Sequence, residues 1–376
     1  MSELLPCPHR PPCPGCPRFG EGLADNPGLA SLAELAADAG LPLRLHEAPC
    51  GHGHRHRGRL AVRGRIDTPR VGIFERGTHW VVDMPECRIH HPAINEVAGA
   101  LRRAITDTRT APYNEKTGRG LVRYVQVAVA RDRGAAQIVI VGNCGRADRV
   151  DGLLQALIER LGARMQGLFF SAQTERGNAI LGATCERVAG APMLEESIAG
   201  AQVFYPPDAF GQSNLDAYEQ AVRRIGDHVP DGSDVVELYA GVGAIGLSLL
   251  RRVGRVRFNE VAEGSLAGLR AGVARLPEED AARVEVHAGA AGDHAALARN
   301  AECVIVDPPR KGLEPSLLAA LCEAPPRRLV YLSCDVGTLR RDVKALHQAG
   351  MGVRAVDAFD FFSYTAHVES LVLLAR

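Results

Sequence analysis

"ELYAGVGAIGLSLL", residues 237–250, is the stretch that decides the fold of the second half of this 376-residue chain. It places Gly241, Gly243 and Gly246 in a G-x-G-x-x-G register between a predicted strand and a predicted helix. Glycines at such a turn let the backbone approach a ligand closely, and an acid about 20 residues further on accepts ribose hydroxyls. Glu260 ends the next predicted strand and has that position. The spacing alone leaves three interpretations open: a methyl-donor site, a dinucleotide site, or glycines needed only for packing.

From Asp216 onward, apolar runs alternate regularly with helical patterns. The runs are VVELY, RVRFNE, VEVHAG, CVIVDPP and LVYLSC, and two later segments, GVRAVDAFDFF and HVESLVLLA, predict a closing pair of strands. This alternation predicts an α/β fold with a Rossmann-like, doubly wound parallel sheet and helices on both faces. Ligands bind at the carboxyl ends of the strands in such sheets. The residues at those ends are Tyr239, Glu260, Asp307 and Cys334.

The first half has a different order of predicted strands and helices, which is typical of an α+β domain. Residues 26–42 and 94–105 have apolar residues at helical spacing. Strand-like pieces occupy residues 59–82, and LVRYVQVAVA and AAQIVIVG, joined by RDRG, predict a β-hairpin. We therefore expect two domains, residues 1–205 and residues 206–376, with the early helix at 26–42 docked on the second.

Composition excludes a membrane-spanning or secreted protein. The chain is 46% hydrophobic and 23% charged, and it has no apolar stretch of membrane-spanning length and no signal-peptide pattern, so we expect a cytoplasmic protein. Its formal net charge is zero, but residues 49–76 hold seven arginines against two acids. This asymmetry is consistent with an RNA-binding surface, or with the arginine bias of a chain that has only three lysines.

Two further motifs bear on chemistry. In LVYLSCDVGTL, residues 329–339, Cys334 ends a buried strand, where an unpaired cysteine is either a small core residue or a nucleophile. In CVIVDPPRKGL, two prolines form a rigid wall after a strand and Asp307 faces the cleft. Enzymes that methylate amino groups have an aromatic residue where this chain has Arg310, so this motif argues against methylation of an exocyclic amine.

Taken together, the motifs resemble those of the S-adenosylmethionine-dependent RNA uracil-5-methyltransferases, over nearly the whole chain. The matching stretches are FGQSN (210–214), ELYAGVG, FNE ending at Glu260, DPPRKG, SCD around Cys334 and HVE ending at Glu369. The resemblance implies that Cys334 is the nucleophile and Glu369 the base. It also implies that the methyl donor is held by Gln212, Tyr239, Gly241, Gly243, Glu260 and Asp307.

The chemistry of uracil gives an independent reason for these two residue types. Carbon 5 is a poor nucleophile, so a thiolate adds to carbon 6 and produces an enolate whose carbon 5 attacks the sulfonium methyl group. The proton on carbon 5 must then be removed before the thiol is eliminated, which requires a base. The sequence departs from the family at two places: Asp335-Val336 replaces Asn-Pro or Asp-Pro, and Ser363 lies where a proline is usual.

The N-terminal stretch CPHRPPCPGCP holds Cys7, Cys13 and Cys16. Its C-x5-C-x2-C spacing resembles the iron–sulfur ligand run of the family's rRNA-modifying members, and the resemblance implies Cys87 as the fourth ligand of a 4Fe–4S cluster. Zinc is the main alternative, although zinc sites more often use paired C-x2-C hooks. CGHGHRHRGR (50–59) lacks a complete metal ligand set, so an RNA-contacting edge or a solvated hairpin is the better interpretation.

The resemblance implies an enzyme of the short branch, which lacks the N-terminal TRAM β-barrel and acts on 23S ribosomal RNA. No protein partner is evident in the sequence, so we expect a monomer. Residues 1–205 would carry the iron–sulfur cluster and bind RNA, and residues 206–376 would be the methyltransferase domain. The alternative from another functional class is a non-catalytic RNA-binding protein that senses redox or iron state through its cluster.

Overall fold

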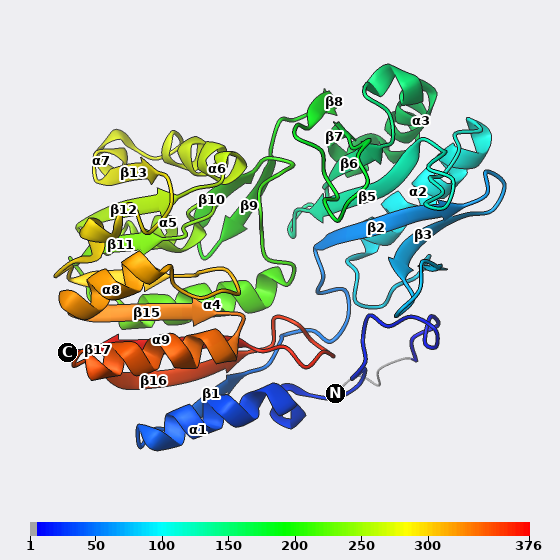
Figure 1. Ribbon diagram of the computed structural model, residues 1–376. Helices are drawn as coiled ribbons and strands as arrows, with labels where there is room; N and C mark the ends of the chain where they lie inside the picture. Colours follow the sequence, from blue (N-terminus) through cyan, green and yellow to red (C-terminus); the bar gives the residue numbers. More distant parts are fainter. Residues whose placement is uncertain (1–5) are drawn as a thin grey trace. The chain divides into compact units, whose positions relative to one another are not determined.

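The computed structural model describes residues 6–376, which divide into two compact units (Figure 1). The first unit comprises the described residues up to Pro17, Cys50–Glu196 and Tyr205–Leu215. The second comprises Arg18–Pro49, Ser197–Phe204 and Asp216–Arg376. An early segment of the chain therefore belongs to the same unit as the second half of the sequence.

The first unit is built on a seven-stranded sheet of order β4-β3-β2-β5-β6-β7-β8. All neighbours pair antiparallel except β6 and β7, and the predicted hairpin is β5–β6, with Val129 opposite Ala136. Apolar residues of α2 and α3 pack in one core with alternate residues of the sheet, such as Val125 and Val127. The elements are β2 (Arg57–Gly64), β3 (Pro69–Phe74), β4 (Val81–Asp83), α2 (Pro92–Asp107), β5 (Val122–Val129), β6 (Ala136–Gly142), α3 (Asp151–Leu161), β7 (Met165–Ala172) and β8 (Glu186–Gly190), with 3₁₀ turns at Ala147–Val150 and Gly162–Arg164.

The second unit is built on an eight-stranded sheet of order β1-β16-β17-β15-β14-β11-β12-β13. The strands of this sheet are β1 (Leu43–His46), β11 (Asp234–Leu238), β12 (Arg255–Glu260), β13 (Val284–Ala288), β14 (Cys303–Val306), β15 (Arg328–Ser333), β16 (Gly352–Phe359) and β17 (Glu369–Ala375). The five strands from β11 to β15 are mutually parallel, as predicted. The predicted closing pair is also present, and β17 inserts antiparallel between β15 and β16.

Helices cover both faces of this sheet, which confirms the predicted doubly wound architecture. The helices are α1 (Ala30–Asp38), α4 (Leu215–His228), α5 (Ala244–Leu249), α6 (Glu263–Val273), α7 (Glu278–Ala281), α8 (Pro315–Glu323) and α9 (Val336–Gln348), with 3₁₀ turns at Leu23–Asp25, Pro27–Leu29 and Ala295–Ala298. Val236 and Leu238 of β11 share a core with α1, α8 and α9. Glu237, between them, points to the opposite face and accepts a hydrogen bond from Gly246 in α5. A separate two-stranded ribbon is formed by β9 (Leu194–Ile198) and β10 (Ala201–Tyr205).

Strand β1 is an addition that the alternation of strands and helices did not predict. It pairs parallel with β16, and His46 lies opposite Phe359. Its attachment includes a polar cluster around Asp357, which is fully buried and bonds His46 Nε2 at 2.7 Å and Arg224 Nε at 2.9 Å. Leu32 and Ala36 of the preceding helix α1 complete the same apolar core. Within residues 6–376 no helix is long and apolar enough to cross a membrane.

Replacing Asp357 with Ala should loosen this edge of the sheet, because it leaves the half-buried guanidinium of Arg224 without its main partner. We expect a loss of about 3 kcal/mol in the local opening free energy, measured by hydrogen exchange of peptides from β1 and β16. Asp227→Ala is the matched control, since that exposed carboxylate also pairs with Arg224 but should contribute less than about 1 kcal/mol. Equal effects of the two substitutions would contradict this account of the edge.

Candidate active site

The glycine-rich turn after β11 adopts backbone conformations that ordinary residues avoid. Gly241 and Gly243 have φ values of 57° and 79°, and Tyr239 has φ of 60°, which a bulky residue adopts only where the surroundings enforce it. The amide of Ala240 donates to the carbonyl of Asn259 at 2.9 Å, which ties the turn to β12. No atom lies within 4 Å of where a Cβ of Gly241 would be, so the turn faces open space that a ligand can occupy.

Glu260 ends β12 beside this turn and is almost completely buried. One carboxylate oxygen accepts from the amide of Gly241 at 2.7 Å. The other accepts from the amides of Val261 at 2.9 Å and Ala262 at 2.7 Å. These bonds orient the carboxylate and link two strand ends, while the oxygen that accepts from Gly241 keeps a lone pair for a further donor such as a ribose hydroxyl.

Glu237 is a second carboxylate at this site, and our sequence analysis missed it. It is buried inside β11 and accepts a hydrogen bond from the amide of Gly246 at 2.6 Å. Burial raises its pKa to about 8, and the charges of Asp307 and Glu260 add to the effect. A Cβ at position 246 would collide with the carboxylate and with the ring of Phe258, which explains the third glycine of the motif. The sequence signal that could have identified Glu237 is an acid within an otherwise apolar strand.

Asp307 follows β14, and the DPPRKG loop that it begins is held by α9. Burial raises the pKa of Asp307 to about 7. The fully buried Asp342 of α9 accepts from the amide of Leu313 at 2.9 Å and from the hydroxyl of Tyr331 at 2.8 Å. Gly312 has φ of 78°, and a Cβ there would lie 2.6 Å from the Asp342 carboxylate. The loop therefore has one conformation next to β15, and Asp342 is a positioning residue that the sequence patterns did not single out.

Cys334 lies between the end of β15 and the start of α9 and is half-buried. Asp335 caps the helix, because its carboxylate accepts from the amide of Thr338 at 2.9 Å. The Ser333 hydroxyl donates to the carbonyl of Asp335 at 3.1 Å and accepts from its amide at 3.2 Å. Local hydrogen bonds thus hold the cysteine turn, where the family resemblance led us to expect a proline at the position of Val336.

Glu369 is the first residue of β17. Because β17 runs antiparallel to β15, its first residue lies at the edge of the sheet where β15 ends and Cys334 follows. Ser370 is opposite Ser333, so Glu369 is level with Cys334. The side chain is 1% exposed, and neither carboxylate oxygen has a hydrogen-bond partner within the described residues. Burial first, and then the charge of Asp307, raise the pKa of Glu369 well above its ordinary value.

The pKa values of Cys334 and Glu369 depend on the charges of neighbouring groups, and Asp307 acts on both. Burial, followed by the charges of Glu369 and Asp307, raises the pKa of the Cys334 thiol to about 11. Arg310 of the DPPRKG loop acts in the opposite direction and favours the thiolate. The site therefore holds a thiol and two carboxyl groups in a poorly solvated place, where each group's charge depends on its neighbours.

The loop before β17 contains Ser363, the second position at which the sequence departs from the family's motif pattern. Its hydroxyl donates to the carboxylate of Asp360 at 2.8 Å. The loop is held by the early segment of the chain: Asn26 donates to the carbonyl of Thr365 at 2.9 Å, and the rings of Phe19 and Tyr364 have centroids 5.0 Å apart. Residues 18–29 thus support the loop that delivers Glu369.

Gln212 is the one predicted donor-binding residue outside this constellation. It lies in the segment Tyr205–Leu215 of the first unit, directly before α4. The other predicted residues, Tyr239, Gly241, Gly243, Glu260, Asp307, Cys334 and Glu369, all belong to the second unit.

The four predicted cluster ligands, Cys7, Cys13, Cys16 and Cys87, all belong to the first unit. Burial, and then the charges of Cys87, Cys13 and Cys7, raise the pKa of Cys16 to about 12, so the four thiols share one neighbourhood. No group of three or more His, Cys, Asp or Glu residues in the described chain is arranged as a metal-binding set. The structure therefore does not support the predicted iron–sulfur ligand set by its geometry.

Comparison with known proteins adds to this geometry. Residues 294–376, which include Asp307, Cys334 and Glu369, match the tRNA (uracil-5-)-methyltransferase family. An uncharacterized RNA methyltransferase of Protochlamydia amoebophila is 29% identical over 100% of this chain and 98% of its own length. Another from Geobacter sulfurreducens is 30% identical over 92% of this chain and 68% of its own length.

Among solved structures, the tRNA (uracil-54, C5)-methyltransferase of Pyrococcus abyssi, in complex with S-adenosyl-L-homocysteine, has the same fold. Its TM-score is 0.77 at 24% sequence identity, over 92% of this chain and 82% of that one. Fold and sequence together place the protein among the RNA methyltransferases. The chain belongs to the RNA methyltransferases, and the match over residues 294–376 agrees with the uracil-5-methyltransferase motifs of its sequence.

The electrostatic coupling of Cys334 predicts its reactivity. Alkylation of the thiol by iodoacetamide, followed by mass spectrometry of the Cys334 peptide, should still accelerate with pH near pH 10, because the pKa is raised to about 11. Glu369→Gln removes a negative charge and should lower the apparent pKa. Arg310→Gln removes a positive charge and should raise it, whereas Lys344→Gln on the exposed side of α9 is a control that should change nothing. A thiol with an ordinary pKa that neither substitution shifts would contradict the description of this site.

Proposed function

We propose that this protein transfers a methyl group from S-adenosylmethionine to carbon 5 of a specific uridine in RNA, through a covalent adduct between Cys334 and carbon 6. One observation carries the proposal: Glu369 is buried without a hydrogen-bond partner in the described residues, at the strand end level with Cys334. Burying a carboxyl group in this way costs folding free energy, and a chemical role accounts for its presence. Family membership supports the same type of reaction.

The residues around the glycine turn fit the methyl donor. S-adenosylmethionine supplies an electrophilic methyl group on a sulfonium centre. The turn at Gly241 has open space for a ligand, and the carboxylate of Glu260 is oriented by three backbone amides to accept ribose hydroxyls. We assign Tyr239 and Asp307 to the same donor site because they lie at neighbouring strand ends, and Gln212 on the family's FxQxN motif.

Cys334 starts the reaction by adding to carbon 6 of the uracil. The sulfur–carbon bond forms while the electrons of the 5,6 double bond move to the oxygen on carbon 4, and carbon 5 of this enolate then attacks the methyl group. The thiol must lose its proton first, against a pKa of about 11 in the free protein. The positive charge of Arg310 favours that loss, so Arg310 is a positioning residue for the thiolate.

Glu369 completes the reaction by removing the proton from carbon 5. The electrons of that C–H bond restore the 5,6 double bond, and the bond between carbon 6 and the Cys334 sulfur breaks to release the thiolate. A carboxylate whose pKa is raised by burial is a stronger base than an exposed one, which suits the removal of a proton from carbon.

We infer 23S ribosomal RNA as the substrate from the motif resemblance, and we propose a monomer as the active form. Residues 1–205 would bind folded RNA and residues 206–376 would carry the chemistry. The excess of arginine over acids in residues 49–76 supports RNA binding by the first part of the chain.

We propose further that Cys7, Cys13, Cys16 and Cys87 hold an iron–sulfur cluster of the 4Fe–4S type. Four thiolates are the donor set that such clusters use. Backbone amides bond two of the sulfurs, from Gly15 to Cys13 and from Ile89 and His90 to Cys87, as they do around cluster ligands. Burial raises the pKa values of Cys13, Cys16 and Cys87 above that of an ordinary thiol, so these groups are protonated at neutral pH and cluster assembly would release their protons.

Glu369→Gln should trap the covalent intermediate. The amide cannot accept the carbon 5 proton, so attack by Cys334 proceeds and release fails. A protein–RNA adduct should then survive denaturing electrophoresis after incubation with ribosomal RNA and the tritiated methyl donor. Cys334→Ala and the double variant should form no adduct and transfer no methyl group.

Cys322→Ala, which removes a half-buried thiol from α8 of the same unit, should retain methyl transfer and is the matched control. Methyl transfer by folded Cys334→Ala would disprove the covalent mechanism. If the wild-type protein binds RNA but transfers no methyl group to it, the non-catalytic redox sensor is the correct interpretation instead.

The protein purified without oxygen should be brown, with the broad visible absorbance of an iron–sulfur cluster. Cys87→Ser should bleach it, because it removes one of four ligands. Cys144→Ser alters another half-buried cysteine of the same unit and should leave the colour unchanged. Stoichiometric zinc in a colourless, active protein would show that the cysteines form a zinc site.

A further inference from the structure

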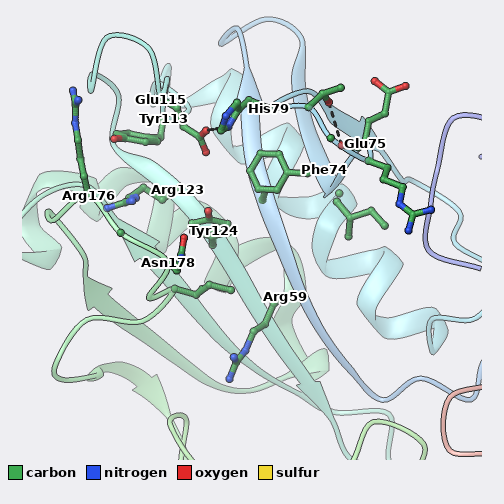
Figure 2. Close-up of a pocket in the computed structure, with 18 residues that line it drawn as sticks. Arg59, Phe74, Glu75, His79, Tyr113, Glu115, Arg123, Tyr124, Arg176 and Asn178 are labelled. Carbon is green, nitrogen blue, oxygen red and sulfur yellow. Dashed lines mark hydrogen bonds and ion pairs between the residues drawn. The ribbon is translucent and has the colours of Figure 1, made fainter. Parts of the chain in front are cut away.

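A cavity of about 790 Å³ opens in the first unit, and none of the residues that line it is assigned above to chemistry (Figure 2). Residues of β2, β3 and β5 form its floor, and the β3–β4 turn and residues 176–180 form its rim. The residues that decide its chemistry are Arg59, Phe74, Arg76, Tyr113, Tyr124 and Arg176. Its volume lies in the range of pockets that bind small organic ligands of nucleotide size.

Aromatic rings form one wall of the cavity, and they are fixed by a buried arginine behind them. The guanidinium of Arg63 lies 5.3 Å from the ring centres of Phe74 and Tyr113 and 5.1 Å from that of Tyr124. Arg63 also donates to the carbonyls of Val62 and Arg123, at 2.9 and 2.7 Å. The rings of Phe74 and Tyr124 are half-exposed and thus present rigid faces to the cavity.

The cavity carries an excess of positive charge. Four arginines line it against Glu75 and Glu115. Glu115 is already engaged, since its two oxygens bond Arg63 and His79, the latter at 2.7 Å. Among the lining arginines, neither Arg76 nor Arg176 has a hydrogen bond or an ion pair to any residue from 6 to 376. These two guanidinium groups are therefore available to an anionic ligand.

The rim beside Arg176 is held in place rather than left to fluctuate. Arg123 donates to the carbonyls of Gln173 and Glu175, at 2.6 and 2.7 Å, and its guanidinium lies 4.7 Å from the ring centre of Tyr113. Gln173 in turn donates to the carbonyls of Ala179 and Leu181. The cavity is thus a preformed site, in which one buried arginine fixes both a ring and the rim.

We propose that this cavity binds an unpaired nucleotide of the RNA substrate other than the uridine that is methylated. An unpaired base stacks on aromatic faces such as those of Phe74 and Tyr124, while arginines such as Arg76 and Arg176 bind its phosphates. A pocket of this kind recognises RNA whose nucleotides are flipped out of their helix, and it would select a folded substrate from other uridine-containing RNA. The inference rests on RNA being the substrate, as proposed above.

The test measures binding of the full-length protein to a fluorescein-labelled single-stranded RNA of about 12 nucleotides, by fluorescence anisotropy. Phe74→Ala should weaken binding about tenfold because one stacking surface is lost, and Phe74→Tyr should restore it. Arg176→Glu should weaken binding by at least tenfold and reduce its dependence on salt. Arg146→Glu is the matched control, because Arg146 is exposed in the same unit but outside the cavity, and it should have a smaller effect.

The outcomes separate this inference from the proposed function. Wild-type protein that binds RNA, with Phe74→Ala and Arg176→Glu no weaker than Arg146→Glu, would overturn the nucleotide pocket and leave the methyltransferase proposal standing. Wild-type protein that binds no RNA would overturn both. Displacement of the labelled RNA by free adenosine or uridine monophosphate at equal concentration would show a site for a free nucleotide, which also overturns the inference.

Discussion

The antiparallel insertion of β17 between β15 and β16 is the constraint on which the site depends. Parallel strands can only bring their carboxyl ends to the ligand-binding edge, so Tyr239, Glu260 and Cys334 reach it in the ordinary way. Glu369 reaches it because its strand runs in the opposite direction, with Ser370 opposite Ser333. The amino end of one strand thereby meets the carboxyl end of another, and a carboxyl group is buried beside a thiol.

This arrangement has an electrostatic consequence for the whole edge. Glu369, Asp307 and Glu237 are acids whose pKa values burial raises, and each lies within reach of another's charge. Holding several acids in a poorly solvated place costs stability, and the surrounding hydrogen bonds offset part of that cost. Three sets of contacts position the acids and Cys334. Asp335 caps α9, Asp342 bonds the DPPRKG loop, and residues 18–29 hold the loop before β17.

The sequence predicted the parallel part of the second unit because each strand and its helix are local in the chain. The alternation of apolar runs marked β11 to β15, and the glycine register marked the turn after β11. Strand β1 escaped prediction because it is four residues long and half-exposed, and its partner β16 is about 300 residues away, so no local pattern reports the pairing. The expectation that the early helix at 26–42 docks on the second domain came from the family resemblance, because the packing of Leu32 and Ala36 in that core is long-range and no local pattern reports it.

For the site, strand-end positions pointed to Tyr239, Glu260, Asp307 and Cys334, whereas Glu369 came from the resemblance alone. Glu237 and Asp342 were missed because an acid within a strand or helix is usually a solvated residue, and only the tertiary structure shows that both are buried. Where the family resemblance led us to expect prolines, at Val336 and Ser363, the chain has hydrogen bonds of Ser333, Asp335 and Ser363 instead, and a pattern based on proline cannot anticipate them.

The central claim is that Cys334 forms a covalent bond to carbon 6 of the target uridine and that loss of the carbon 5 proton resolves it. RNA in which uridine is replaced by 5-fluorouridine tests this most directly, because fluorine cannot leave as a proton. Incubation of the wild-type protein with this RNA and S-adenosylmethionine, followed by nuclease and protease digestion and mass spectrometry, should identify a methylated 5-fluorouridine attached to the peptide that contains Cys334. Attachment to a different residue, or methylated product released without any adduct, would contradict the account.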